Sequence, residues 1–191
     1  MAGIDYSMTC PSVTISKFTP EFSYKNCTQY FLTDNKKFQK CWDNQIFGNK
    51  MPNDYSCAEE RFDNLSNFFI GIMKGYNVTD VAIEDYSMGS RGRVFHIAEN
   101  TGILKHKVWK SFGISIKYYA PTHIKMFACG KGKGNANKDV MYNQFQTETL
   151  VDLREKLAYT SETIGSPIAD LVDSYFVCKR LHNELLSTDT E

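Results

Sequence analysis

No stretch of the sequence approaches the roughly 18 consecutive apolar residues of a membrane-spanning helix. The N-terminus also lacks the basic segment and long apolar run of a secretion signal. The six cysteines include no C-x-x-C pair and no companion histidine at a ligand spacing, which argues against a zinc site. We therefore expect a cytoplasmic protein with reduced thiols and no membrane partner.

Other familiar chemical motifs are missing as well. The loop Gly130-Lys-Gly-Lys-Gly-Asn135 does not match G-x-x-x-x-G-K-[ST], so ATP binding is not expected. None of the four histidines lies four residues from another or beside a cysteine, so we expect no imidazole-bound metal. No serine or cysteine has a recognisable partner base in the sequence, so we expect no covalent nucleophile.

Acidic residues are almost absent from the middle of the chain, although the formal net charge is zero. Residues 91–138 include ten basic residues and one acidic residue, whereas residues 139–191 include four basic and ten acidic residues. Such a cationic segment indicates a surface for a polyanion, and a solvated face or an ordinary surface loop is the alternative. The basic residues that we expect to contact a DNA backbone are Arg91, Arg93, Lys105, Lys107, Lys110, Lys131 and Lys133.

The chain is long enough for one good core, since 42% of its 191 residues are hydrophobic and 14% are aromatic. We expect a single domain that spans residues 1–191. Residues 34–56 are rich in Asn, Lys, Gln, Asp and Gly with isolated aromatics, which is typical of an insertion packed by a few side chains. The sequence assigns this insertion no task.

Strands and helices alternate after an antiparallel start. Apolar patterns predict strands over residues 3–6, 11–18, 28–33, 81–84 and 114–119. Helical spacing predicts helices over residues 58–74, 91–112, 121–128, 136–145 and 167–186. The prediction is an α/β fold with a mixed five-stranded sheet, in which the first three strands are antiparallel and helices flank the sheet.

Four acids occur in apolar surroundings, where an unpaired carboxylate costs several kcal/mol. Asp5 lies within the first predicted strand and Glu84 ends the strand over residues 81–84. Asp170 and Asp173 lie three residues apart on the last predicted helix, with Cβ atoms about 5–6 Å apart. Two such charges about 4 Å apart repel by roughly 4 kcal/mol at an effective dielectric near 20. A divalent cation between them would replace this repulsion by attraction. The alternatives are a turn acid at Asp5, an exposed strand end at Glu84, and a salt-bridging helix face.

Oxygen ligands of this kind suit Mg²⁺, which retains several waters and binds substrate phosphates. Two ions about 3.5–4 Å apart activate water and stabilise the leaving oxygen in phosphodiester hydrolysis. We therefore predict a metal site formed by Asp5, Glu84, Asp170 and Asp173.

Three motifs in this order resemble those of the RuvC-type Holliday-junction resolvases, particularly the compact phage-encoded ones. They are Gly3-Ile-Asp-Tyr-Ser-Met8, Ala82-Ile-Glu-Asp-Tyr86 and Ala169-Asp-Leu-Val-Asp-Ser174. The resemblance implies a ribonuclease H-like fold, a homodimer in the cytoplasm, and incision of branched DNA with Mg²⁺ or Mn²⁺, two ions per site. It also implies that Lys125 and Lys138 are catalytic residues near the scissile phosphate, and that Tyr86 or Met88 packs on bases at the crossover.

The chain also departs from that family. Tyr6-Ser7 follows the first Asp, where the family usually has Pro-Gly or Pro-Ser, and residues 34–56 have no obvious counterpart. Four-way junctions, flaps and forks therefore remain open as substrates. Two alternatives also remain: a non-catalytic DNA-binding module, and another nuclease of the same fold, such as a ribonuclease H or a packaging nuclease.

Overall fold

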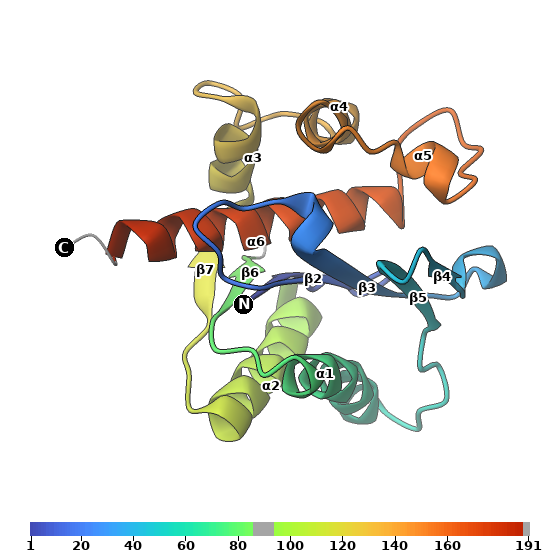
Figure 1. Cartoon of the computed structure of the whole chain (residues 1–191). Helices are drawn as coiled ribbons and strands as arrows, with labels where there is room; N and C mark the ends of the chain where they lie inside the picture. The colour runs from blue at the N-terminus through green and yellow to red at the C-terminus, as the bar shows by residue number, and fades with distance from the viewer. Residues whose placement is uncertain (86–93, 189–191) are drawn as a thin grey trace.

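A single twisted sheet forms the centre of the protein (Figure 1). The computed structural model describes residues 1–85 and 94–188. Within these residues the sheet has seven strands in the order β4-β5-β3-β2-β1-β6-β7. The strands are β1 (Ala2–Asp5), β2 (Ser12–Ser16), β3 (Cys27–Thr33), β4 (Cys41–Trp42), β5 (Ile46–Lys50), β6 (Val81–Glu84) and β7 (Lys117–Tyr119).

Most of the strands run in the same direction. β1 and β2 pair antiparallel, as do β2 and β3, which confirms the predicted antiparallel start. The pairs β1–β6, β3–β5 and β6–β7 are parallel. The carboxyl ends of β1, β3, β5, β6 and β7 therefore lie along one edge of the sheet, called here the carboxyl edge.

The prediction of five strands was wrong. Residues 34–56, which were expected to form an insertion, contribute β4 and β5 to the described sheet. Asp43 and Asn44 have positive φ angles of 49° and 52°, and they turn the chain so that Trp42 pairs with Ile46. Asp and Asn tolerate this conformation, so the turn residues were a usable signal. β4 and β5 were not predicted, because each has only isolated apolar residues on its buried side and so shows no clear alternation.

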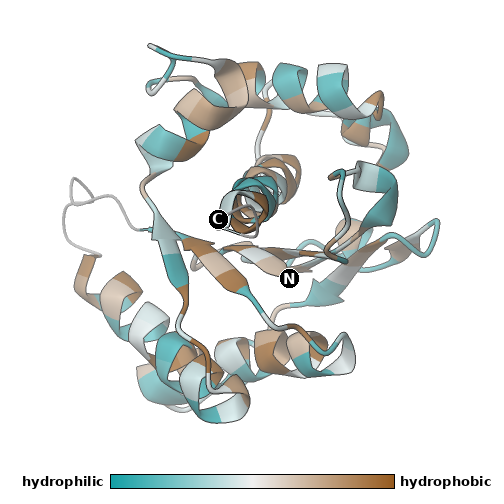
Figure 2. Cartoon of the chain, turned by 60° about the vertical axis from the view of Figure 1, so that its left-hand side comes forward, coloured by the Kyte–Doolittle hydropathy of each residue, from teal (hydrophilic) through white to brown (hydrophobic). Residues whose placement is uncertain are grey.

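Helices cover both faces of the sheet, as predicted (Figure 1). α1 (Ala58–Gly75) and α2 (Val94–Phe112) pack together on one face, and α6 (Ile168–Thr188) packs on the other. Figure 2 shows α6, near the C label, enclosed between the sheet and an outer layer. That layer consists of α3 (Pro121–Cys129), α4 (Lys138–Thr149) and α5 (Leu153–Lys156). No helix in residues 1–85 and 94–188 is long and apolar enough to span a membrane.

Alternation along the strands decides which side chains face α6. In β1, Ala2 and Ile4 belong to the core beneath α1 and α2. Side chains alternate between the two faces of a strand, so Gly3 and Asp5 face α6. In the same way Val81 and Ile83 of β6 lie in the α1–α2 core, which leaves Ala82 and Glu84 on the α6 face.

The α6 backbone lies directly against β1 at Gly3. A Cβ atom built on Gly3 would lie 2.2 Å from the backbone nitrogen of Cys178. Real Cβ atoms do not approach backbone this closely, so only glycine fits at this position. This contact sets how deep α6 lies on the sheet, and with it the position of every acid on that helix.

Buried polar groups attach the first turns of α6 to the sheet. The Ser12 hydroxyl donates to the carbonyl oxygen of Asp170 at 2.6 Å, and the Gln29 amide donates to the carbonyl oxygen of Leu171 at 2.8 Å. The Thr14 and Ser174 hydroxyls share a hydrogen bond of 2.9 Å. These side chains are almost fully buried, so each hydrogen bond offsets a desolvation cost and specifies one orientation of the helix.

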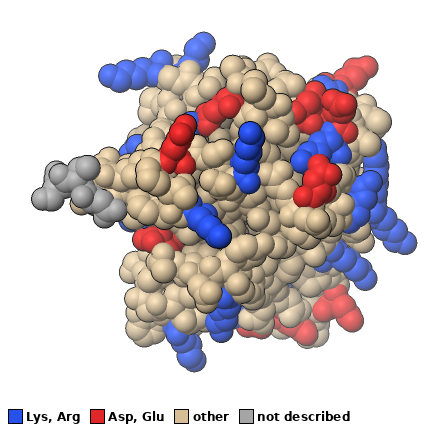
Figure 3. All heavy atoms as spheres, in the orientation of Figure 1, with Lys and Arg blue, Asp and Glu red and all other residues tan. Residues whose placement is uncertain are grey.

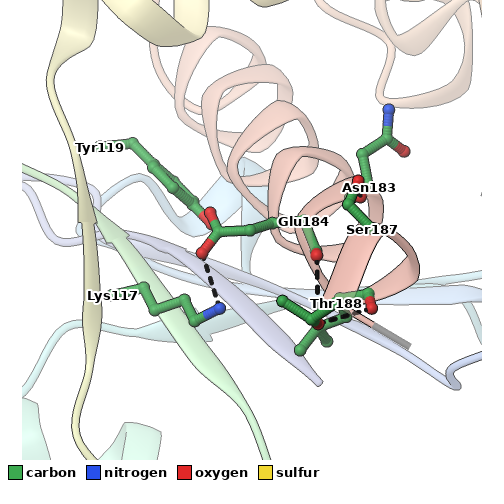
Figure 4. Close-up of polar contacts among 7 residues, drawn as sticks. Lys117, Tyr119, Asn183, Glu184, Ser187 and Thr188 are labelled. Carbon is green, nitrogen blue, oxygen red and sulfur yellow. Dashed lines mark hydrogen bonds and ion pairs between the residues drawn. The ribbon is translucent and has the colours of Figure 1, made fainter. Parts of the chain in front are cut away.

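The opposite end of α6 is attached to β7 through a single carboxylate (Figure 4). One oxygen of Glu184 pairs with the Lys117 ammonium at 2.7 Å, and the other accepts a hydrogen bond from Tyr119 at 2.8 Å. Both ends of α6 are thus held against the sheet, which limits rotation of the helix about its axis.

The predicted helices all exist, with shifted boundaries. The helix expected from residue 136 begins at Lys138, because the Asn137 side chain accepts a hydrogen bond from the Val140 backbone at 2.9 Å and caps the helix. The last strand covers only Lys117–Tyr119 of the expected 114–119. The expected start of the second helix, from Arg91, lies outside the described residues.

Candidate active site

Two of the predicted acids lie side by side at the carboxyl edge. β1 and β6 are adjacent and parallel, and Ile4 is aligned with Ile83. The next residue on each strand is Asp5 and Glu84, and both side chains face α6. Strand pairing therefore brings together two carboxylates that are 79 residues apart in the sequence.

The other two acids approach from α6. Asp170 lies in the first turn of the helix and Asp173 in the next, and the hydrogen bonds of Ser12 and Gln29 fix this end of the helix. Each of the four carboxylates interacts electrostatically with the other three. The structure thus brings together all four acids that the sequence singled out.

Burial and mutual repulsion oppose ionisation of these acids. Burial, followed by the neighbouring carboxylates, raises the pKa of Asp5 and of Asp173 well above the usual range. Burial raises the pKa of Glu84 to about 7, while Lys125 acts in the opposite direction. Burial also raises the pKa of Asp170, against the effect of Ser166 and Lys138. A cluster of this kind is unfavourable as ionised groups unless positive charge joins it.

Two lysines lie close to the cluster. Lys125 of α3 acts on Glu84 and Asp173, and Lys138, the first residue of α4, acts on Asp170 and Asp173. Lys125 is half-buried and Lys138 is exposed. Both come from the outer helical layer, so the structure places them beside the acids, as the resemblance implied. Their catalytic role remains a prediction.

The donor set fits a divalent cation in its chemistry. Oδ2 of Asp170 is buried and has no hydrogen-bond partner, and four carboxylates offer oxygen atoms to one region. Hard cations prefer such ligands. Across residues 1–85 and 94–188, no three Asp, Glu, His or Cys side chains are already arranged as ligands of one ion. Binding therefore requires side-chain rotation, which would replace carboxylate repulsion by attraction to the cation.

Neutralising one acid should stabilise the protein when no divalent cation is present. For Asp173→Asn we expect the free energy of unfolding in EDTA to rise by about 1 kcal/mol, because an amide cannot ionise and removes the penalty of keeping this carboxyl group in the cluster. Denaturant titrations in EDTA and in millimolar Mg²⁺ measure the effect. Mg²⁺ should stabilise the wild type more than the variant. A variant that is less stable than the wild type in EDTA would show that Asp173 has a favourable partner.

The predicted DNA contacts are scattered over the molecule. Lys131 and Lys133 are exposed in the connection between α3 and α4. Figure 3 shows basic side chains that project at the upper left, the side on which α3 lies in Figure 1. This connection forms two hydrogen-bonded turns, Gly130–Lys133 and Lys133–Ala136. It borders the helix that carries Lys138, so its lysines lie on the same side of the protein as the cluster.

Two of the three lysines of α2 have partners within the protein. Lys107 forms an ion pair with Asp63 at 2.6 Å, and the Lys105 ammonium lies 4.2 Å from the Tyr118 ring centroid. Lys110, near the end of α2, is exposed. The end of α2 leads to the start of β7, on the side opposite the carboxyl edge. Contacts of these three residues with DNA remain a prediction, while Tyr86, Met88, Arg91 and Arg93 lie outside the described residues.

Four basic residues on the carboxyl edge were not predicted from the sequence. Lys36, Lys37, Lys40 and Lys50 are exposed around β4 and β5, and none forms an ion pair with a carboxylate of the described ranges. Figure 3 shows basic side chains along the right side, over this end of the sheet. Three interstrand spacings separate β1 from β5, so Lys50 lies about 14 Å along the edge from Asp5. Only the sheet order shows that these lysines and the acids share an edge.

Solved structures share this arrangement of elements. The structure of RuvC from Thermus thermophilus matches with a TM-score of 0.58 and 13% sequence identity, over 98% of this chain and 96% of that one. RuvC of the same organism in complex with a Holliday junction substrate matches with a TM-score of 0.62 and 12% identity, over 97% and 95%. The yeast mitochondrial Holliday junction resolvase Ydc2 matches with a TM-score of 0.54 and 12% identity, over 97% and 80%. No protein-family model and no curated protein matches the sequence.

A mixed sheet with helices on both faces defines an α/β fold, here of the ribonuclease H-like type that the RuvC structures share. Within that class, the chain has the fold of the RuvC-type Holliday-junction resolvases, over nearly its whole length. The resemblance expected from three short motifs is thereby confirmed for the fold.

Proposed function

We propose that this protein is a metal-dependent endonuclease that cuts branched DNA, with the four-way junction as its main substrate. The convergence of Asp5, Glu84, Asp170 and Asp173 at one edge of a RuvC-type fold is the observation that carries the proposal. Repulsion among these acids has no structural benefit, since a core of apolar residues would be more stable. The repulsion is offset when the acids bind the cations that the reaction requires.

The acids would hold Mg²⁺ or Mn²⁺, two ions per site, through their carboxylate oxygens. Bound there, the ions would activate a water and neutralise charge that develops on the phosphate. Asp5 and Glu84 offer oxygens from the rigid sheet, and Asp170 and Asp173 offer them from a helix that is fixed at both ends. Little reorganisation of the backbone is then needed before reaction.

The lysines would bind and orient the DNA strand. Lys125 and Lys138 lie within electrostatic range of the acids, so their ammonium groups suit the non-bridging oxygens of the phosphate to be cut. Lys131 and Lys133 would bind phosphates above the site, and Lys36, Lys37, Lys40 and Lys50 would bind those of an arm that follows the carboxyl edge. These contacts position DNA without reading its sequence.

One of the similar structures contains a Holliday junction, which supports the choice of a branched substrate. Flaps and forks offer a comparable bend at the branch and are included in the proposal. A homodimer would present two sites to the two symmetrical strands of a junction. A cytoplasmic location belongs to the same proposal.

A cleavage assay decides among the candidate functions. Purified protein with Mg²⁺ or Mn²⁺ should nick a labelled four-way junction faster than a flap, and both faster than linear duplex or an RNA–DNA hybrid. Binding without cleavage in either metal would favour the non-catalytic module. Preference for the hybrid or for linear duplex would favour a ribonuclease H or a packaging nuclease on the same fold.

DNA binding should weaken steeply with salt. If the protein neutralises about five phosphates, the logarithm of the affinity should fall against that of the salt concentration with a slope near −4.5. Replacing both Lys131 and Lys133 by alanine should reduce the slope by about 1.8, because two phosphate contacts are lost. Fluorescence anisotropy in EDTA, at several salt concentrations, measures the slopes without cleavage.

The matched control replaces Lys25 and Lys74 by alanine. Both are exposed, and they precede β3 and β6 at the edge of the sheet opposite the acids. This double variant has the same change in net charge, and its slope should equal that of the wild type. Equal slopes for both double variants would remove the connection between α3 and α4 from the DNA-binding surface.

A further inference from the structure

A hollow of about 450 Å³ lies on the α1–α2 side of the carboxyl edge. Its lining includes Met8, Tyr55, Arg61, Phe62 and His96, and we call it the Tyr55 hollow. Met8 lies three residues beyond Asp5, and His96 lies near the start of α2, the helix that follows β6 and Glu84. The Tyr55 hollow is therefore formed by α1 and the residues before it, and it is bordered by segments that follow the two strands carrying the acids.

The guanidinium of Arg61 has few partners. One Nη2–H donates to the backbone carbonyl of Met8 at 2.8 Å, while Nε is buried and makes no hydrogen bond. No carboxylate of residues 1–85 or 94–188 forms an ion pair with Arg61. Buried donors without partners are rare in proteins and call for an explanation. A cation kept without a counter-charge at the wall of a hollow points to a ligand.

The other walls favour a flat ligand. The Arg61 guanidinium lies 5.6 Å from the ring centroid of Tyr55, and the Phe62 and His96 rings lie 6.4 Å apart. Tyr55 remains 40% exposed, so a large part of its surface is free to contact a ligand. Planar aromatic and guanidinium groups stack on nucleobases, whereas a tetrahedral anion would use the guanidinium charge alone and gains nothing from the rings.

Acids near the hollow disfavour a phosphate inside it. Glu59 and Glu60 lie in the first turn of α1, next to Ala58 of the lining, and Glu99 lies 3.4 Å from the His96 ring. Their charges would repel a second anion but have little effect on a neutral base. An uncharged planar group with hydrogen-bond acceptors thus fits better than an anion.

We propose that the Tyr55 hollow binds one unstacked nucleobase of the substrate DNA, close to the branch point. Tyr55 stacks on the base, and Arg61 donates hydrogen bonds to its acceptor atoms. Bases next to a branch have already lost part of their stacking, so moving one out of the helix costs less there than in continuous duplex. This inference rests on the proposed function, since it assumes that branched DNA lies along the carboxyl edge.

A double-mutant cycle between protein and DNA tests the inference. Four-way junctions with a single abasic site at each position around the branch are bound in EDTA by the wild type and by Tyr55→Ala. For the wild type, loss of one particular base should weaken binding about tenfold, the effect of one base–aromatic stack. Tyr55→Ala should weaken binding of the intact junction equally and lose nothing more when that base is removed.

Control variants separate a contact with the base from a loss of structure. Tyr55→Phe retains the ring and should restore coupling, while Arg61→Lys keeps the charge, loses the planar group and should weaken binding. Tyr76 is 45% exposed at the opposite edge of the sheet, so Tyr76→Ala should behave as the wild type. Thermal unfolding shows whether each variant is folded.

The outcomes distinguish a failure of the base-binding role from a failure of the proposed function. If the wild type neither binds nor cuts branched DNA, the proposed function fails. If it does both, and the effects of Tyr55→Ala and every abasic site are additive, the base-binding role of the hollow is wrong while the function stands. Saturable binding of a free deoxynucleoside monophosphate that Tyr55→Ala abolishes, without coupling to any abasic site, would also overturn the inference.

Discussion

Asp5→Asn is expected to lower the rate of junction cleavage by about 10³-fold while leaving junction binding intact. Metal ions contribute several kcal/mol of transition-state stabilisation, and each 1.36 kcal/mol corresponds to a factor of ten in rate. Asp5 interacts with all three other acids, so its replacement disturbs every combination of ligands that the cluster offers. Single-turnover cleavage in Mg²⁺ and anisotropy in EDTA measure the two quantities separately.

Binding should be retained because the variant keeps every lysine and loses one negative charge that repels phosphates. A second readout does not depend on activity: Mn²⁺ should raise the melting temperature of the wild type more than that of Asp5→Asn. Asp80→Asn serves as the control, since Asp80 precedes β6 at the opposite edge of the sheet. Cleavage at the wild-type rate by Asp5→Asn would place the catalytic metal site elsewhere.

Gly3→Ala is expected to destabilise the protein by about 3 kcal/mol, at the upper end of the usual cost of overpacking. The added methyl group would lie within 2.6 Å of the backbone nitrogen, Cα and Cβ of Cys178. Backbone atoms cannot rotate away, so α6 must move from the sheet as a unit. Asp170 and Asp173 move with the helix, and we expect cleavage to be lost even under conditions where the variant remains folded.

Gly71→Ala is the matched control for Gly3→Ala. Gly71 is exposed within α1, and no atom of the described residues lies within 4 Å of the position of its added Cβ. Because alanine is a better helix former than glycine, this variant should be more stable than the wild type by about 1 kcal/mol. Urea denaturation compares the two variants. A Gly3→Ala protein with wild-type stability and cleavage would show that the contact between β1 and α6 can accommodate an added methyl group.

Local signals identified the acids because each depends on a few neighbouring residues. Apolar neighbours marked Asp5 as an acid within a strand and Glu84 as an acid at a strand end, and the spacing of Asp170 and Asp173 put both on one helix face. The structure brings all four together, and their role as ligands remains a prediction.

Distant pairing could not be derived from local signals. No strand was predicted within residues 34–56, yet β5 pairs with β3 and extends the sheet. The paired residues lie more than a dozen positions apart, so no local pattern marks this pairing. The approach of α1 to α2 gives Lys107 a partner in Asp63, which the sequence did not indicate, and its contact with DNA remains a prediction. In each case a contact between remote segments decides the role of the residue.

The sequence by itself determined the chemistry that is available: carboxylates in apolar settings, a cationic middle segment, and elements whose apolar periods fix their type. The tertiary structure alone decided that β1 lies beside β6, that α6 approaches β1 at Gly3, and that the lysines of residues 34–56 share an edge with the acids. The physical reason is the separation along the chain between the residues that interact. Helix and strand patterns arise from neighbours in the chain, whereas the meeting of strands and helices depends on which buried surfaces fit together across the whole fold.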